Sequence, residues 1–134
     1  MESKTVSDSL VNFESSTLFL EDSVTLSTLD LRKLKERPTF KLVRFADAHY
    51  LGDIANGLRH GLGVMLYKSG RRYEGSWLHD KRSGSGFEAY ANGHSYSGEY
   101  HNGKHHGQGL YRWSPDESYA GNFVNGLRQG RGKW

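Results

Sequence analysis

The chain has 134 residues, 17 glycines, no cysteine, a hydrophobic content of 35% and a formal net charge of +3. That hydrophobic content is low for a globular domain, so we expect no thick, layered core. The missing cysteines exclude a disulfide framework, a thiol nucleophile and cysteine-ligated zinc. The start of the chain leads into no apolar signal segment, and no apolar run approaches about 18 residues. We therefore expect a cytoplasmic protein that is neither secreted nor membrane-spanning.

The first 40 residues differ in composition from the rest. They contain no glycine, and residues 1–30 hold eleven serines and threonines with no sustained period of apolar residues. Such a segment buries too little surface to offset its ordering entropy, so we predict a mostly disordered N-terminal segment over residues 1–40. Within it, a short helix is predicted over residues 28–36, with Ser27 as the N-cap and Pro38 as the stop signal. The segment is then a solvated leader, with a short docking or phosphorylation segment as the alternative.

Residues 41–134 are dominated by a repeat of 23 residues that starts at Tyr50. It gives units 50–72, 73–95 and 96–118 and a partial unit 119–134. Position one is always tyrosine, and twelve of the 17 glycines occupy positions three, twelve and fourteen. Position five holds Ile54, Trp77, Tyr100 and Phe123, and position eighteen holds Tyr67, Tyr90 and Trp113. We expect residues 41–49 to supply one further strand before the first unit.

Each unit predicts two short strands joined by a tight turn. Positions one, three and five alternate along a strand, so their side chains share one face. The turn signal is Asn-Gly in three units, beginning with Asn56-Gly57, and His79-Asp80 in the second unit. Glycine inside a strand leaves room for a neighbouring ring, and we expect the rings of positions five and eighteen to use it. The prediction is an all-β fold, an elongated single-layer antiparallel meander of β-hairpins.

The units resemble the MORN repeat (membrane occupation and recognition nexus). Its pattern Tyr-x-Gly-x-aromatic-x-Asn-Gly-x-Arg-x-Gly-x-Gly is closely matched by residues 96–109, and residues 121–132 match it from its glycine onward. The second unit departs from it, because Leu78-His-Asp-Lys-Arg-Ser precedes Gly84. The last unit stops at position sixteen, so we expect part of a longer array, with a short paired edge as the alternative.

The resemblance implies a non-enzymatic scaffold for protein–protein interaction, associated with the cytoskeleton or a cilium. A peripheral membrane module that binds acidic phospholipids or phosphoinositides is the first alternative. A regulatory array within a larger enzyme, such as a phosphatidylinositol-phosphate kinase, is the second. An uncapped terminal strand makes end-to-end self-association a further expectation.

No catalytic or cofactor site is predicted. The glycine pairs never open a helix after a strand, and Ser76 stands where a phosphate-binding loop needs lysine. Histidine columns two strands apart, roughly 9–10 Å, do not converge on a metal ion. Glu74, Glu88 and Glu99 are assigned to the solvent side of their strands. We therefore expect no enzyme, no cofactor and no metal, and no nucleic acid because packing requires the aromatic residues.

Two sets of candidate binding residues follow from the columns. The aromatic set is expected to dock an extended or helical segment of a partner protein. Its members are Tyr50, Ile54, Tyr67, Trp77, Tyr90, Tyr100, Trp113 and Phe123. The cationic set either bonds turn carbonyls and holds the hairpins, or meets acidic lipid headgroups at the inner face of a membrane. Its members are Arg59, His60, Lys81, Arg82, Lys104, His105, His106, Arg128 and Arg131.

Overall fold

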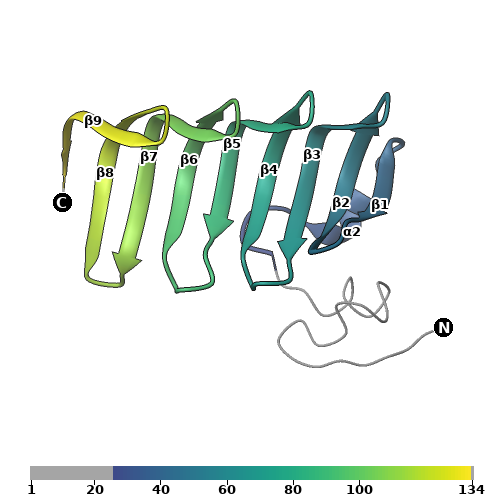
Figure 1. Ribbon diagram of the computed structural model, residues 1–134, viewed down its shortest axis with the longest axis horizontal. Coiled ribbons are helices and arrows are strands. Elements are labelled where there is room, and N and C mark those ends of the chain that lie inside the picture. Colours follow the sequence, from purple (N-terminus) through teal and green to yellow (C-terminus); the bar gives the residue numbers. More distant parts are fainter. Residues whose placement is uncertain (1–25, 134) are drawn as a thin grey trace.

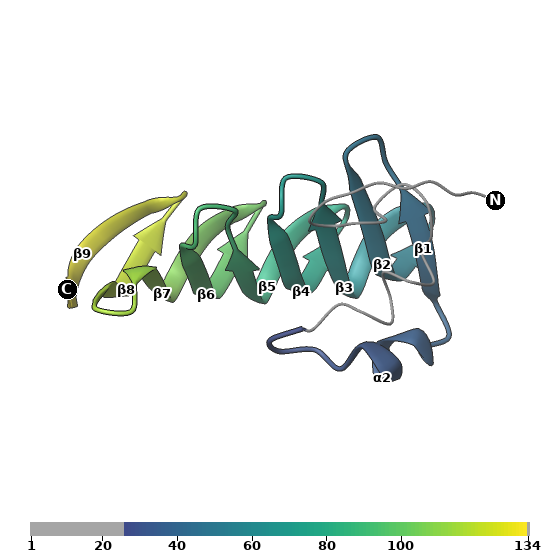
Figure 2. The same ribbon diagram turned by 90° about the horizontal axis from the view of Figure 1, so that it is seen from below.

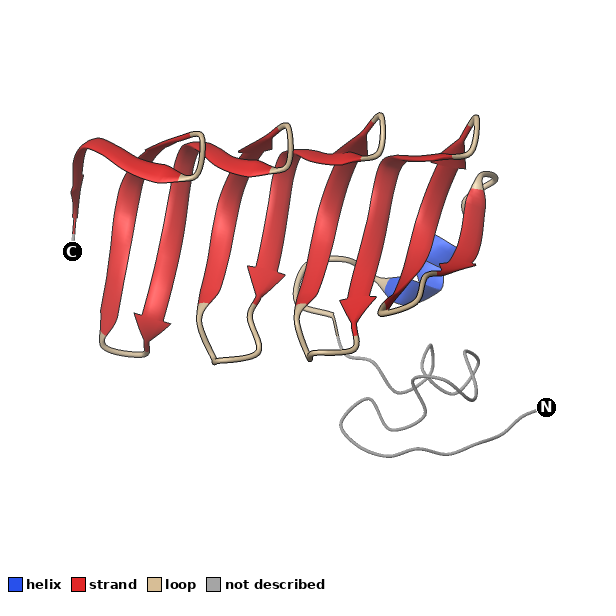
Figure 3. Ribbon diagram, in the orientation of Figure 1, coloured by secondary structure: helices blue, strands red, loops and turns tan. Residues whose placement is uncertain are grey.

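The computed structural model describes residues 26–133, and for residues 129–133 the description is limited to the backbone. Within this range, one short helix precedes nine strands that form a single antiparallel sheet in sequence order. The elements are α2 (Leu31–Lys35), β1 (Phe40–Arg44), β2 (Ala48–Ala55), β3 (Leu58–Tyr67), β4 (Arg72–Leu78), β5 (Lys81–Ala89), β6 (Ser95–His101), β7 (Lys104–Ser114), β8 (Glu117–Val124) and β9 (Leu127–Lys133). The strands stand side by side in one row (Figure 1), and most of the described chain is strand (Figure 3). The predicted elongated meander is confirmed.

Two-residue turns join the two strands of each unit along one edge of the sheet. The Asn-Gly pairs at three of these turns have positive φ at both residues, as at Asn56 (53°) and Gly57 (78°). These values are what a type I′ hairpin turn requires. His79 and Asp80 adopt the same left-handed backbone, with φ of 47° and 71°. The second unit therefore keeps the turn geometry without the Asn-Gly sequence.

Glycine at position fourteen makes room for a tyrosine ring. A Cβ added to Gly63 would collide with the ring and hydroxyl of Tyr50, and Gly86 and Gly109 stand in the same relation to the tyrosines of their own units. The Tyr50 hydroxyl crosses this glycine and donates to the carbonyl oxygen of Asp53 at 2.8 Å. The expectation that glycine makes room for a ring is right. The ring over position fourteen, however, comes from position one rather than from positions five and eighteen.

Buried rings form a continuous row on one side of the sheet, the aromatic face. The rings of Tyr50 and Trp77 meet edge to face, with centroids 5.4 Å apart, and Tyr96 and Phe123 repeat this contact at 5.2 Å. Such pairs add roughly 0.5–1.5 kcal/mol each beyond area burial, so they couple each unit to the next. The buried members of this face are Ala48, Tyr50, Met65, Tyr73, Trp77, Tyr96, Tyr100, Tyr119 and Phe123.

Residues 26–39, here called the N-terminal strap, run along the side of the sheet opposite the aromatic face (Figure 2). This side is called the second face. Leucines of the strap and of α2 pack on aliphatic side chains of β2 and β3. Residues 1–40 were predicted to have little fixed structure, and this prediction is wrong for the strap because its leucines pack against this apolar patch. The prediction for residues 1–25 lies outside the described residues. The buried members of the patch are Leu34, Leu51, Val64 and Leu66.

The helix is shorter than predicted, since it spans Leu31–Lys35 instead of residues 28–36. Asp30, not Ser27, is the N-cap, and its carboxylate accepts two amide hydrogen bonds from the first turn. The Ser27 amide instead donates to the carboxylate of Glu74 at 2.7 Å. The contact with the sheet therefore moves the start of the helix three residues along the chain.

The strands at the two ends of the sheet are both paired. The strand predicted within residues 41–49 is β1, which pairs with β2 from Phe40↔Asp53 to Arg44↔His49. At the other end, β9 pairs with β8 and closes the last hairpin at Val124↔Leu127. The second run of the last unit thus forms a paired strand, whose register shifts between Gly121 and Asn122.

Candidate functional site

The aromatic residues predicted to bind a partner divide into buried and half-buried members. The buried members are 0–5% exposed and belong to the core: Tyr50, Trp77, Tyr100 and Phe123. The half-buried members pack against this core from outside: Ile54, Tyr67, Tyr90 and Trp113. Only the second group offers contact surface to another molecule.

A pocket of about 360 Å³ opens between half-buried rings in the C-terminal part of the aromatic face. Tyr90, Tyr111 and Trp113 line it, and the ring centroids of Tyr111 and Trp113 lie 5.1 Å apart. Arg128 lies over the Trp113 ring at 5.3 Å, and the side of Leu127, which is 71% exposed, forms part of the wall. The pocket thus combines apolar surface with a cation and phenol hydroxyls, which suits an apolar anchor beside an acidic group.

The cations at position ten reach the turn of the following unit. Arg59 donates to the carboxylate of Asp80 at 2.6 Å and to its carbonyl oxygen at 3.0 Å, and its guanidinium lies 4.6 Å from the centre of the Trp77 ring. Arg82 donates to the carbonyl oxygen of Gly103 at 2.6 Å. This column therefore holds turns and rings together, which was one of its two predicted roles.

The remaining members of the cationic set lie along the turn edge and in β9. Lys81 and Lys104 are exposed, and Arg128 is exposed above its tryptophan. The side chain of Arg131 lies outside the described residues. The fixed cations of the aromatic face are thus Arg59 and Arg82, which already serve packing, and the exposed cations are Lys81 and Lys104 at its edge together with Arg128.

The histidines of the turn edge lie in pairs rather than in larger clusters. The ring centroids of His60 and His79 are 5.2 Å apart, and those of His101 and His106 are 5.3 Å apart. Among the described residues, no group of three or more His, Cys, Asp or Glu side chains could hold a metal ion. No helix in the same range is long and apolar enough to cross a membrane.

Glu88 lies within the aromatic face, and its side chain is 0% exposed. Arg82 Nη1 donates to both carboxylate oxygens at 2.9 and 3.0 Å, and Arg71 forms a second ion pair with Glu88. The hydroxyls of Tyr100 and Tyr90 donate to the same carboxylate at 2.7 and 3.2 Å. The prediction that Glu88 faces solvent is therefore wrong.

His105 completes this glutamate network, which consists of Glu88, Arg71, Arg82, Tyr90, Tyr100 and His105. The His105 ring stacks on Tyr96 at 3.7 Å, and its Nε2 lies 3.0 Å from the Tyr90 hydroxyl. Burial opposes ionisation of Glu88, but His105 and the other members outweigh it and lower its pKa to about 2. The carboxylate is therefore charged at neutral pH and serves as the common acceptor of the network.

The repeat pattern indicates that Glu88 lies on the aromatic face, although the sequence-based prediction assigned it to the solvent side. Positions fourteen, sixteen and eighteen alternate on one strand, so Glu88 must share a face with Gly86 and Tyr90. Position sixteen holds Met65 and Tyr111 in the neighbouring units. Glu88 is thus the one charged residue at position sixteen among Met65, Glu88 and Tyr111. Tyr111 lines the pocket beside Tyr90 and Trp113 because position sixteen lies on the aromatic face.

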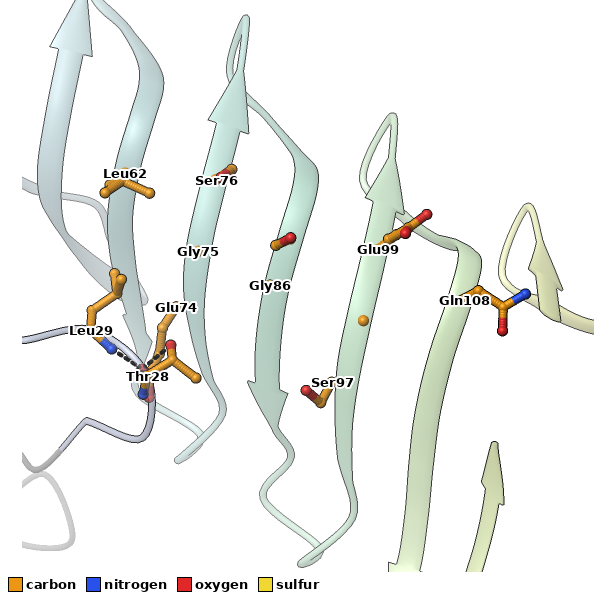
Figure 4. A pocket seen from close by; sticks show the side chains of 12 residues that line it. Thr28, Leu29, Leu62, Glu74, Gly75, Ser76, Gly86, Ser97, Glu99 and Gln108 are labelled. Atoms are coloured by element: carbon orange, nitrogen blue, oxygen red, sulfur yellow. Dashed lines mark hydrogen bonds between the residues drawn. The ribbon is translucent and has the colours of Figure 1, made fainter. Parts of the chain in front are cut away.

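On the second face, Glu74 holds the start of the strap. Its side chain is 0% exposed and accepts hydrogen bonds from the amides of Ser27 (2.7 Å), Thr28 (2.7 Å) and Leu29 (3.1 Å) and from the Thr28 hydroxyl (2.8 Å). Figure 4 shows Thr28 and Leu29 beside Glu74. Arg72 Nε donates to it at 2.9 Å. Burial opposes ionisation, yet these hydrogen bonds lower the pKa of Glu74. The predicted solvent position is wrong here because the strap covers the carboxylate.

Asp53 holds the other end of the strap. It is 4% exposed and accepts hydrogen bonds from Arg37 Nε (3.0 and 2.9 Å), the Thr39 hydroxyl (3.0 Å) and the Leu62 amide (3.0 Å). Burial again opposes ionisation, and the hydrogen bond from Arg37 with those from Leu62 and Thr39 lowers the pKa of Asp53. Two carboxylates of the sheet therefore fix the strap.

A groove of about 420 Å³ continues from the strap across the second face (Figure 4). Thr28 and Leu29 line its strap side, and Glu99 and Gln108 line its far side. Glycines of β4, β5 and β6 contribute to its lining, so backbone is accessible there. No feature of the sequence predicted this groove.

This architecture, an open array of glycine-spaced hairpins with two accessible faces, is that of a repeat-based binding module. The MORN repeat model matches residues 50–71, 73–95, 96–116 and 119–134. These segments make up more than half of the 134 residues, and the chain belongs to the MORN-repeat family. No curated protein matches the chain.

Proposed function

We propose that this protein is a non-enzymatic interaction scaffold that docks a segment of a partner protein along the aromatic face. The observation that carries the proposal is the pocket between Tyr90, Tyr111 and Trp113. Rings held on a sheet lose little conformational entropy on binding, so they are effective anchors.

The spacing of the units sets the form of the partner segment. Each unit contributes two strands, so equivalent half-buried rings recur at roughly 10 Å along the sheet. In an α-helix, side chains seven residues apart are separated by about 10.5 Å. In an extended segment of the polyproline II type, side chains three residues apart lie on the same face and are separated by about 9 Å. A helix with apolar residues at every seventh position, or a polyproline II segment with one at every third, therefore places one anchor on each unit.

The charges beside the pocket favour acidic residues in that segment. Arg128 is exposed over Trp113, and His94 Nδ1 lies 3.0 Å from the Tyr111 hydroxyl. The exposed acids nearby are Asp116 and Glu117, which lie at the turn between β7 and β8. The preferred segment thus carries apolar anchors flanked by acidic groups on the Arg128 side.

Binding to acidic phospholipids is the competing function, and the contacts of the cationic set weigh against it. Arg59 and Arg82 are engaged with carboxylates and turn carbonyls, so lipid binding would have to compete with these internal bonds. Lys81, Lys104 and Arg128 remain exposed, and each cation near an anionic surface contributes about 1 kcal/mol. Three such cations give weak binding.

The cellular setting of the proposal comes from family analogy. We place the scaffold in the cytoplasm, at the cytoskeleton or a cilium, with the inner face of a membrane as the alternative. Self-association through terminal strands and a regulatory role within a larger enzyme stay predictions. Analysis of the full transcript for a catalytic domain tests the latter.

Site-specific photo-crosslinking tests the docking face. A crosslinking amino acid replaces Trp113 on the aromatic face or Leu127 at its pocket, and Phe87, half-buried on the second face, provides the matched control. We expect discrete protein adducts from the first two positions that are competed by an acidic peptide with apolar residues at every seventh position, whereas this peptide should not compete any adduct formed at Phe87. Equal competition at all three positions would argue against the proposal.

Flotation with vesicles containing phosphoinositides tests the competing function. We expect no binding above that to neutral vesicles. Salt-sensitive flotation that is lost in the Lys81→Ala/Lys104→Ala variant would favour the membrane role instead.

A further inference from the structure

The second face carries its own repeated columns, and the strap uses those at positions four and fifteen only at the first unit. Position four holds Asp53 in the first unit and Glu99 in the third, and position fifteen holds Val64 and Leu110. Val64 is 0% exposed under the strap cluster, whereas Leu110 is half-buried. The third unit therefore repeats an acid and an aliphatic residue that the strap does not cover.

The strap shows how this face binds a peptide segment. Arg37 Nη2 lies 2.9 Å from Asp53 Oδ2, and the leucines of the strap pack on the aliphatic patch beside it. The strap carries four basic and two acidic side chains, so it is a basic, leucine-bearing segment. The contact combines one guanidinium–carboxylate pair with apolar burial.

Glu99 is placed as Asp53 is. A Cβ added to the position-twelve glycine would collide with the carboxylate in both units, at Gly61 with Asp53 and at Gly107 with Glu99. Glu99 is exposed, and among the described residues no hydrogen bond or ion pair engages its carboxylate. It lines the groove whose other side is lined by Thr28 and Leu29 of the strap.

The other charge of the groove is already balanced. Glu74 is paired with Arg72 and saturated by amides of the strap, so Glu99 determines the charge that the groove attracts. Small side chains and glycine beside it let a peptide backbone approach closely. The site therefore selects a cation on an extended or short helical segment.

We propose that the groove on the second face docks a basic, leucine-bearing segment of a partner protein, with a guanidinium on Glu99 and an aliphatic side chain towards Leu110. The site continues the surface that the strap already occupies. It is independent of the aromatic face, which selects acidic partners, and the array can therefore join two different proteins on its two sides.

Fluorescence anisotropy with the full chain tests this proposal. The probe is a labelled peptide with the sequence of residues 26–39, which has the required chemistry. We expect saturable binding that Glu99→Gln weakens about fivefold, the effect of one exposed ion pair. Glu117→Gln removes the same charge from an exposed position outside the groove and should change binding less than about twofold.

A double-mutant cycle locates the contact. The peptide with Arg37→Gln should bind the wild-type chain about fivefold more weakly but lose less than about twofold on the Glu99→Gln chain. Trp113→Ala, on the other face, should leave peptide binding unchanged. This variant separates failure of the groove from failure of the proposed function.

Four outcomes would overturn the proposal. The first is the absence of saturable binding, and the second is binding that is insensitive to Glu99→Gln. The third is faster hydrogen exchange of the chain's own residues 26–39 as the peptide binds, which would mean that the peptide replaces the strap. The fourth is concentration-dependent dimerisation that Glu99→Gln abolishes, because the occupant would then be a second copy of this chain.

Discussion

The two faces of the sheet obtain their cover in different ways. On the aromatic face, each unit supplies a tyrosine, a glycine that accommodates it and a ring that meets the next unit, so the cover repeats with the sequence. On the second face, the cover is a single strap fixed to Glu74 and Asp53. Cover built by repetition couples every unit to its neighbours. Cover built from unrepeated contacts can be released locally while the sheet persists.

The largest expected effect concerns Glu88, an unrepeated feature of the aromatic face. Glu88→Ala leaves the guanidiniums of Arg71 and Arg82 without their buried carboxylate, a change that typically costs about 3–5 kcal/mol. We expect this loss in the free energy of unfolding, measured by urea denaturation. Glu117→Ala, at an exposed carboxylate, should stay within about 0.5 kcal/mol of wild type. A loss as small as that for Glu88→Ala would mean that the rings alone stabilise this face.

Acid provides the next largest effect and acts on the same network. The folded pKa of Glu88 is lowered from 4.5 to about 2, so its contribution is present above pH 4.5 and is lost as the pH falls towards 2. The shift corresponds to about 3 kcal/mol at roughly 1.4 kcal/mol per pKa unit. Glu74 and Asp53 also have lowered pKa values and add to the acid loss in the same direction.

A pH series of urea denaturation measures this loss. Wild type should lose stability between about pH 4.5 and 2, and the part that Glu88→Gln removes should be missing from the variant's profile. Parallel profiles for the two proteins would exclude Glu88 as the main titrating group.

Gly109 and Gly103 distinguish packing from backbone conformation on the aromatic side. A Cβ on Gly109 would meet the Tyr96 ring, whereas Gly103 has φ of 82° and nothing within 4 Å of an added Cβ. Gly109→Ala should therefore cost about 1–3 kcal/mol by overpacking. Gly103→Ala should cost about 1 kcal/mol because an L-residue is strained in that backbone region. Thermal melts of both variants check the order, and a reversed order would contradict the role assigned to the tyrosine column.

The same contrast explains how far the sequence could predict this molecule. Turns, strands and the tyrosine column recur in every unit, so periodicity alone identifies them. The sequence did not predict that Tyr50 and its equivalents fill the space above the position-fourteen glycines. A repeat period shows which positions are equivalent, but it does not show which ring extends over the neighbouring strand. Glu88 and the strap occur once each. The column of Met65 and Tyr111 indicates the face of Glu88, but the ion pairs of Glu88 and the contacts of the strap with Glu74 and Asp53 do not recur and leave no periodic signal.

The smallest effect concerns the second face. Glu74→Gln keeps an acceptor for the strap amides but removes the charge, so the free energy of global unfolding should fall by only about 1 kcal/mol. Hydrogen exchange should nevertheless accelerate over residues 27–36 while the amides of β6 and β7 keep their protection, because the strap is released without opening the sheet. Glu99→Gln, a matched change on the same face that touches no strap residue, should leave both regions as in wild type. If hydrogen exchange accelerated equally in the strap and in β6 and β7 of Glu74→Gln, the strap and the sheet would form one cooperative unit. The distinction between the two faces would then be wrong.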